Sequence, residues 1–224
     1  MKKLIILITC CFVCISSIYA QDDNLEVCVN VGGTFPKGNF HKYTDDGYYG
    51  NARLVAHLKS MKALSGFTEF SGSFFKYTTE DVLLTDGIRQ REVVKKNSQY
   101  SVSWHLGMML GSGSRNSFFR PKLGLAGGLY LFNTQTLLVD DIFIDDPPLA
   151  EDNETQVRVG WRGIVGANFF FTPNWGISLE FTSDQVLNLH NTVEFIPEVG
   201  VTKVGQSARF NNYSIGVIFP IPID

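Results

Sequence analysis

The sequence has little charge, and outside its first residues it has little cysteine. Only 18% of the 224 residues are charged and the formal net charge is -3, which excludes a polybasic nucleic-acid-binding chain. The chain also lacks a phosphate-binding glycine loop, a metal-binding histidine pair and a nucleophile elbow. We therefore predict no catalytic residue, no cofactor or metal site, and no nucleic-acid partner.

Long hydrophobic runs are missing as well, since no stretch after residue 20 approaches about 18 apolar residues. The longest apolar segment, Leu123–Phe132, contains three glycines. Helical membrane spans are therefore excluded. With 13% aromatic residues and 44% hydrophobic residues, the chain is equally unlike a disordered protein.

The first 20 residues have the three-part pattern of a secretory signal peptide. Lys2 and Lys3 are followed by an apolar run, Leu4–Ile18, and by the small residue Ala20. Cleavage after Ala20 would leave residues 21–224 as the mature chain. An uncleaved anchor is disfavoured because the apolar run is shorter than the roughly 20 residues that span a bilayer.

Cysteine is almost absent from this mature chain. Three of the four cysteines lie in the signal segment, which leaves only Cys28. Lipidation at one of the three is disfavoured because Leu7–Cys10 lacks the small residues that precede a lipidated cysteine. A single thiol excludes an internal disulfide and a thiolate zinc cluster, so the exported chain needs another source of stability.

What the mature sequence does contain is repeated period-2 alternation, typical of strands with one apolar face. The clearest segment is 100–110, where large apolar residues alternate with Ser101, Ser103, His105 and other small residues. Further segments of this kind give eight predicted strands. They lie at about 25–32, 51–60, 66–77, 100–110, 119–132, 157–169, 175–182 and 212–221.

Short and long connectors alternate between these segments. The short ones are about 61–65, 112–117 and 172–174, and the long polar ones are about 36–50, 78–97, 133–155 and 188–207. Outer-membrane barrels show this asymmetry, with short periplasmic turns and long outer loops. We therefore predict an all-β fold, an eight-stranded antiparallel transmembrane up-and-down β-barrel formed by residues 21–224.

A soluble barrel that binds an apolar ligand in its centre is the alternative, because its strands also alternate. Two observations weigh against it. Aromatic residues gather near the strand ends on the apolar face, as in interfacial girdles, and the opposite face carries charge and glycine. The girdle candidates are Tyr100, Trp104, Trp161, Phe169, Phe171, Trp175, Phe181 and Phe219.

Residues 157–181 resemble the penultimate hairpin of small outer-membrane β-barrel domains of the OmpA/OmpW/OmpX type, a porin-like family. The likeness lies in glycine-rich alternation, an apolar strand end, the turn Thr172-Pro173-Asn174 and a rising strand that ends at Glu180 and Phe181. This resemblance implies a place in the bacterial outer membrane, in contact with outer-membrane lipids and lipopolysaccharide.

The last strand resembles the C-terminal insertion signal of such barrels. Ser214, Gly216, Phe219 and Ile221 match its pattern, although the chain continues to Asp224 where the family usually ends on an aromatic residue. The resemblance implies recognition of this strand by the barrel-assembly machinery.

If the aromatic face meets lipid, the other face lines the lumen and carries both signs of charge. We predict a hydrogen-bonded ion network that fills the interior, with Arg158 and Arg162 paired to Glu180 across the short hairpin. A narrow ion path is the alternative. The predicted luminal residues are Glu26, Asn30, Arg53, His57, Lys59, Glu69, Ser101, Ser103, His105, Lys122, Arg158, Arg162, Asn168 and Glu180.

Ser103 and His105 could suggest a lipid-modifying enzyme, since outer-membrane acyl hydrolases place a serine and a histidine close together. Here no acidic residue that could orient the histidine is identifiable, and both residues fall on the predicted luminal face. We therefore predict that the chain is not an enzyme.

Two of the long connectors differ in charge. One is acidic, at Asp140, Asp141, Asp145, Asp146, Glu151, Asp152 and Glu154, and another carries Arg89, Arg91, Lys95 and Lys96. The acidic spacing does not match an EF-hand, and a solvated loop is favoured over a cation site.

The function predicted from all of this is structural or interactive, within the bacterial outer membrane. The outer loops would meet an extracellular partner or a small ligand. A narrow channel is the second hypothesis, a soluble periplasmic binder the third and a lipid-modifying enzyme the fourth.

Overall fold

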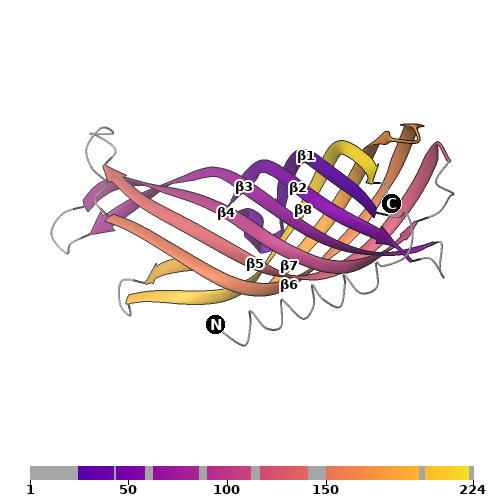
Figure 1. Ribbon diagram of the computed structural model, residues 1–224. Helices are drawn as coiled ribbons and strands as arrows, with labels where there is room; N and C mark the ends of the chain where they lie inside the picture. The colour runs from indigo at the N-terminus through magenta and orange to yellow at the C-terminus, as the bar shows by residue number, and fades with distance from the viewer. Residues whose placement is uncertain are drawn as a thin grey trace.

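The computed structural model describes residues 25–42, 44–58, 63–85, 90–111, 117–140, 150–196 and 200–221. They form a closed barrel in which each strand pairs antiparallel with its neighbours in chain order and the last pairs with the first (Figure 1). The predicted eight-stranded up-and-down barrel is confirmed. Its strands are β1 (Leu25–Lys37), β2 (Asp45–His57), β3 (Leu64–Thr85), β4 (Gln90–Gly111), β5 (Phe119–Asp140), β6 (Ala150–Thr172), β7 (Trp175–Ile196) and β8 (Gly200–Ile221).

Helix is almost absent from the described residues. A 3-10 helix, η1 (Gly38–Lys42), joins β1 to β2. No helix in the described part of the chain is long and apolar enough to cross a bilayer. The predicted signal peptide, residues 1–20, lies outside the described residues.

The strands are strongly inclined to the barrel axis. Followed once around the ring from Leu25, the residue pairing returns to β1 at Phe35, ten residues further along. With the usual rise per residue and strand spacing, this displacement corresponds to a tilt of about 40° and a backbone radius of about 8 Å. An interior of that width is one that side chains alone can fill.

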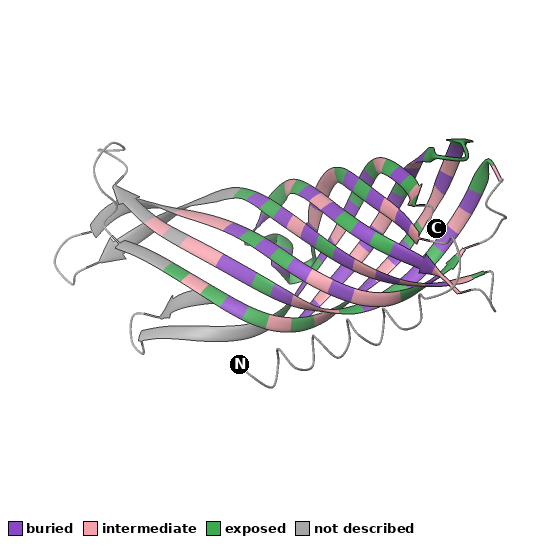
Figure 2. Ribbon diagram, viewed as in Figure 1, coloured by how far each residue is buried: buried purple, intermediate pink, exposed green. Residues whose placement is uncertain are grey.

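Burial alternates residue by residue along the strands, as the sequence pattern predicts. The purple bands of buried residues in Figure 2 are separated by pink and green bands along each strand. In β4, Ser101, Ser103 and His105 are buried, whereas Val102 and Met108 on the opposite face are exposed. In this part of β4, polar residues therefore point into the barrel and apolar residues point out of it.

The two ends of the barrel differ in a way that corrects the predicted connector lengths. At one end β6 and β7 are joined by the tight turn at Pro173 and Asn174, as predicted. At the other end, most of the predicted loops 78–97, 133–155 and 188–207 are strand, because β3–β4, β5–β6 and β7–β8 continue as long hairpins. The predicted loop 36–50 is likewise shortened to the connection between Lys37 and Asp45.

Towards the long hairpins, β6 and β7 stop pairing with each other, so the barrel is no longer closed there. The ladder between β6 and β7 ends at the pair Gly160–Val186, while β5–β6 and β7–β8 continue to pair beyond that level. Asn188, the one non-glycine residue with a positive φ among the described residues, lies in an irregular part of β7 close to this point. The outer part therefore consists of a four-stranded sheet, β3–β6, and a separate two-stranded ribbon, β7–β8.

Glycine permits close packing where the barrel closes between β8 and β1. A Cβ atom on Gly216 would lie 2.0 Å from the Val29 carbonyl oxygen and 2.2 Å from Asn30 Oδ1. The missing side chain leaves room for Asn30, which donates a hydrogen bond of 2.8 Å to Asn51 on β2. Gly216 therefore has a steric role inside the barrel, in addition to its place in the predicted insertion signal.

Replacing Gly216 by Ala is expected to lower the free energy of unfolding by about 1–3 kcal/mol, because the new methyl group overlaps backbone and Asn30 atoms. Urea titration of the protein in detergent micelles measures this loss. Gly66→Ala is the matched control, since a Cβ there would meet nothing within 4 Å. Equal effects of the two variants would contradict the steric role.

Candidate functional site

The centre of the barrel holds a network of six charged side chains, here called the lumen network. Alternation along five different strands points these side chains inward, and each is at least 90% buried. Three are cations and three are anions, so the network is balanced in charge. Its members are Arg53 on β2, Glu69 on β3, Lys122 on β5, Arg162 on β6, and Glu180 and Asp184 on β7.

Arg53 joins opposite walls of the barrel. Its Nη1 and Nη2 donate to the two carboxylate oxygens of Glu180 at 2.7 and 2.8 Å, and its Nε donates to Glu69 Oε2 at 2.6 Å. The bidentate geometry is the strongest arrangement that an arginine and a carboxylate can form. This one side chain therefore ties β2 to both β3 and β7.

Arg162 forms a second set of bonds across the lumen. Its Nε donates to Asp184 Oδ1 at 2.7 Å, and its Nη1 donates to the Tyr49 hydroxyl at 3.0 Å and also to Glu69. Tyr130 donates its hydroxyl proton to the same Asp184 oxygen. Asp184 thus holds an arginine and a tyrosine in fixed positions.

Lys122 completes the network. Its Nζ donates to Asn168 Oδ1 at 2.7 Å, to Ser178 Oγ at 2.8 Å and to a carboxylate oxygen of Glu180. The ammonium group therefore has three oxygen partners, which is its full donor capacity. Buried charges without partners would be strongly unfavourable, and here each charge has at least one opposite charge in contact.

The predicted pairing of Arg158 and Arg162 with Glu180 is wrong. The register of the hairpin places Arg162 opposite Asp184 and Glu180 opposite Gly166. Arg158 lies nearer the long hairpins, where its Nε donates to the Asn188 carbonyl oxygen at 2.8 Å. Arg158 thus links β6 and β7 just beyond the last backbone pair and takes no part in the lumen network.

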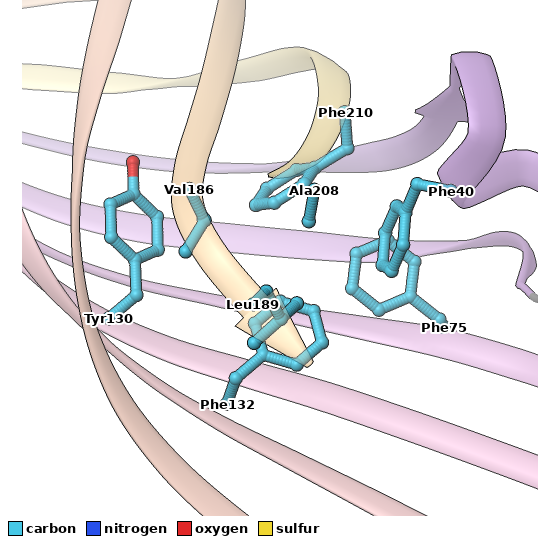
Figure 3. Packing of buried hydrophobic residues seen from close by; sticks show 8 residues of the cluster. All are labelled: Phe40, Phe75, Tyr130, Phe132, Val186, Leu189, Ala208 and Phe210. Atoms are coloured by element: carbon cyan, nitrogen blue, oxygen red, sulfur yellow. The ribbon is translucent and has the colours of Figure 1, made fainter. Parts of the chain in front are cut away.

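An aromatic plug closes the lumen on the side of the long hairpins. The 3-10 helix η1 turns Phe40 inward, where its ring meets Phe75 edge-on at 5.3 Å between centroids and Phe132 at 5.8 Å (Figure 3). All members of the plug are buried. They are Phe40, Phe75, Tyr130, Phe132, Val186, Leu189, Ala208 and Phe210.

A smaller ionic group lies at the end with the short turns. Arg120 Nη1 donates to Glu26 Oε1 at 2.8 Å, and the guanidinium lies over the Phe170 ring at 3.6 Å from its centroid. His57 Nε2 lies 3.2 Å from the other oxygen of Glu26, while a hydrogen bond of 2.7 Å joins His57 Nδ1 and Ser65. The lumen is therefore occupied at this end too.

Ser103 and His105 contact different partners in the lumen. Ser103 Oγ shares a hydrogen bond of 2.7 Å with Ser71 on β3. His105 is fully buried, with its ring edge-on to Tyr130 at 4.9 Å and its two nitrogens each 3.9 Å from a carboxylate, of Glu69 and Asp184. Both carboxylates are already held by Arg162, so His105 packs beside the network as a filler of the lumen.

Metal ligands do not gather in the described ranges: no group of three or more histidine, cysteine, aspartate or glutamate side chains is placed to hold an ion. Cys28, the cysteine that lies in the described part of the chain, is buried and forms no disulfide there. The centre of the acidic connector, residues 141–149, and Arg89 lie outside the described residues, as does Lys59.

Most of the predicted luminal residues are indeed buried inside the barrel; His57 is half-buried there, and Arg158 is partly exposed in the upper wall. Sequence reasoning missed Tyr49, Asn51, Arg120, Tyr130 and Asp184. Period-2 counting could have found Asp184, because it continues the inward series of Ser178, Glu180 and Thr182. Tyr49 gives no such signal, since it lies in a segment that was predicted to be loop.

Comparisons with known proteins give structural likeness only. No protein-family model and no curated protein matches the chain. Among solved structures it is similar to Neisserial surface protein A (12% identity, 88% of this chain, 97% of the other, TM-score 0.49). It is also similar to the outer membrane protein OprG from Pseudomonas aeruginosa (12%, 90% and 98%, 0.49). A third is Ail, the attachment invasion locus protein of Yersinia pestis (11%, 89% and 99%, 0.46). At such identities function rests on this chain's own residues.

Replacing Glu180 by Gln is expected to cost about 3–5 kcal/mol of unfolding free energy, because Arg53 and Lys122 then face a neutral amide in a buried site. Urea titration measures the loss. The control is Asp46→Asn, at an exposed position outside the network.

The double variant Lys122→Met, Glu180→Gln removes one cation together with one anion. We expect it to lose less stability than the sum of the two single variants, since the lumen returns to balanced charge. Strict additivity in this cycle would contradict the coupling of the two side chains.

Proposed function

We propose that this protein is an outer-membrane β-barrel of structural or interaction type, anchored by its outward apolar face and acting through the surfaces of its outer hairpins. The observation that carries the proposal is the filled lumen. The side chains of Arg53, Glu69 and Arg162 have 0% solvent exposure, so they are completely enclosed by the protein. Because side chains fill the centre of the barrel, we expect the function to depend on its outward-facing surfaces and its outer hairpins.

The outward face supports membrane insertion. Large apolar side chains that would normally be buried are exposed along the strands, including Val31 at 63%, Leu125 at 63% and Val159 at 57%. A continuous exposed apolar surface of this kind marks contact with lipid. Strands carry it across the bilayer without unpaired backbone groups, because the barrel is closed.

Aromatic side chains gather towards both ends of this face. Near the short turns, Phe118 and Phe171 meet at 5.7 Å between ring centroids, and Phe171 and Trp175 at 5.4 Å. Near the hairpins, Phe74 stacks on Tyr100 at 6.2 Å. Two girdles that border an apolar band are the arrangement of outer-membrane barrels.

Fractionation and a heat-modifiability gel test the membrane location. We expect the protein in the membrane pellet, with a band that shifts on boiling, because a closed barrel resists detergent until heated. A soluble band that does not shift would contradict the proposal and favour the soluble periplasmic binder.

Planar-bilayer recording separates the proposed role from the channel hypothesis. We expect no steady single-channel steps from the wild-type protein, because the lumen network and the aromatic plug both occupy the path. Steps that change in size in Glu180→Gln would instead identify a conducting lumen. Phe40→Ala serves as the control that removes part of the plug while leaving the lumen network intact.

A further inference from the structure

The outward face of β7, β8 and β1 changes its chemistry in regular steps along the barrel. In β8, Ile221, Phe219, Val217 and Ile215 are exposed and apolar, and Tyr213 follows them. Each faces an apolar or glycine partner on β1. The outward face of β8 is therefore apolar over the four rows from Ile221 to Ile215 and then carries the ring of Tyr213.

Three aromatic rings end the apolar part of this face. Tyr213 lies 5.4 Å from Phe35 and 5.0 Å from Phe181 between ring centroids, so rings from β1, β7 and β8 form one cluster. The cluster occupies the side of the barrel nearer the long hairpins. It is part of the outer girdle.

Two cations follow immediately beyond the aromatic cluster. Lys37 and Arg209 are direct partners in the ladder between β1 and β8, and both are exposed on the outward face. Like charges placed directly opposite each other repel. The partner of Arg209 on β7 is Gln185, which is neutral.

No acidic side chain offsets this pair in the described part of the chain. The ladder between β1 and β2 ends at Thr34, and none of the ion pairs among the described residues includes Lys37 or Arg209. The two cations therefore present an uncompensated double positive charge to the surroundings.

Another exposed lysine shows the contrast. Lys76 on β3 also follows an aromatic pair, Phe74 and Tyr100, but Asp45 lies directly opposite it on β2. The β3 position is locally neutral, whereas the position at the β1–β8 junction is not.

The height of the cation pair fits the phosphate layer of a membrane. With a strand tilt of about 40°, the eight residues from Ile221 to Tyr213 rise about 21 Å, and Arg209 lies about 10 Å further out. The apolar band of outer-membrane barrels is about 25 Å tall. Lys37 and Arg209 therefore lie just outside the hydrocarbon layer, where lipid phosphates are found.

We infer that Lys37 and Arg209 bind a phosphate group of a glycolipid of the lipid A type in the outer leaflet, with the acyl chains against the rows below. The inference rests on the proposed outer-membrane location. Arg209 supplies a planar fork suited to phosphate oxygens and Lys37 supplies a compact second charge. Gln185 offers an amide beside them, and the ring cluster of Phe35, Phe181 and Tyr213 supports the glycolipid backbone at the interface.

The inference is tested by native mass spectrometry of the folded protein. The protein is reconstituted in phosphatidylcholine vesicles that contain bisphosphorylated lipid A or its dephosphorylated analogue, and is then extracted in mild detergent. We expect wild-type protein to retain the phosphorylated lipid over the analogue. One cation near an anionic surface contributes about fivefold in affinity, so Lys37→Gln with Arg209→Gln should reduce retention by about 10- to 25-fold.

Two further variants make the test specific. Lys76→Gln removes one cation from the locally neutral position and should change retention less than twofold. The exchange Lys37→Arg with Arg209→Lys keeps the charge and should restore most of the binding. A boiling shift for every variant confirms that each barrel is folded before its lipids are counted.

Each other result overturns a distinct claim. The proposed site would be overturned if wild type and the double glutamine variant retained equal amounts of phosphorylated lipid A. It would also be overturned if Lys76→Gln lost as much lipid as the double variant. Neither result would contradict the membrane barrel. Displacement of the lipid by millimolar inorganic phosphate would show an anion site that needs no lipid, and would overturn the lipid assignment. A wild-type protein that neither inserts nor shifts on boiling would overturn the proposed function and the inference together.

Discussion

The central constraint on this molecule is the narrowness of the closed barrel. Eight strands with a displacement of ten residues leave a backbone radius of about 8 Å, and every second residue must enter that space. Charged side chains at inward positions then have no route to solvent and must find each other. Arg53, Glu180 and their neighbours satisfy this requirement with balanced charge, and Phe40 closes the space from the hairpin side.

The resulting contacts join strands that are not neighbours in the sheet. Arg53 and Glu180 are 127 residues apart in sequence, and Arg162 and Glu69 are 93 apart, so each pair forms only when the whole ring is assembled. Backbone ladders hold adjacent strands together, whereas these pairs cross the lumen and fix the shape of the ring. Removing one charge thus affects closure of the barrel as well as one local contact.

Sequence periodicity predicted the fold and the inward face well, because both depend on the residue-by-residue alternation of a strand. Glu26, Lys122 and Asn168 are buried as that alternation requires. Partner choice was not predictable in the same way. The pairing of Arg162 with Asp184 depends on an irregular register near Phe170 and Thr172, and the pairing of Arg53 with Glu180 depends on the tilt of the whole barrel. The long hairpins were missed because polar sequence beyond the apolar band resembles loop, although its backbone pairs as strand.

The same alternation that fills the lumen also orders the outside. In the proposed membrane location, the surroundings of an outward-pointing residue depend on its height in the bilayer, so the chemistry of these residues changes with position along the strand. On β8 the outward residues are apolar from Ile221 to Ile215, followed by Tyr213 and then by Arg209. The opposite walls carry their own aromatic rings, but Lys76 has an acid across from it and Lys37 has a second cation. Because ordinary strand pairing favours opposite charges, a like-charged pair that has no acid opposite it among the described residues supports the inferred lipid phosphate as its counterion.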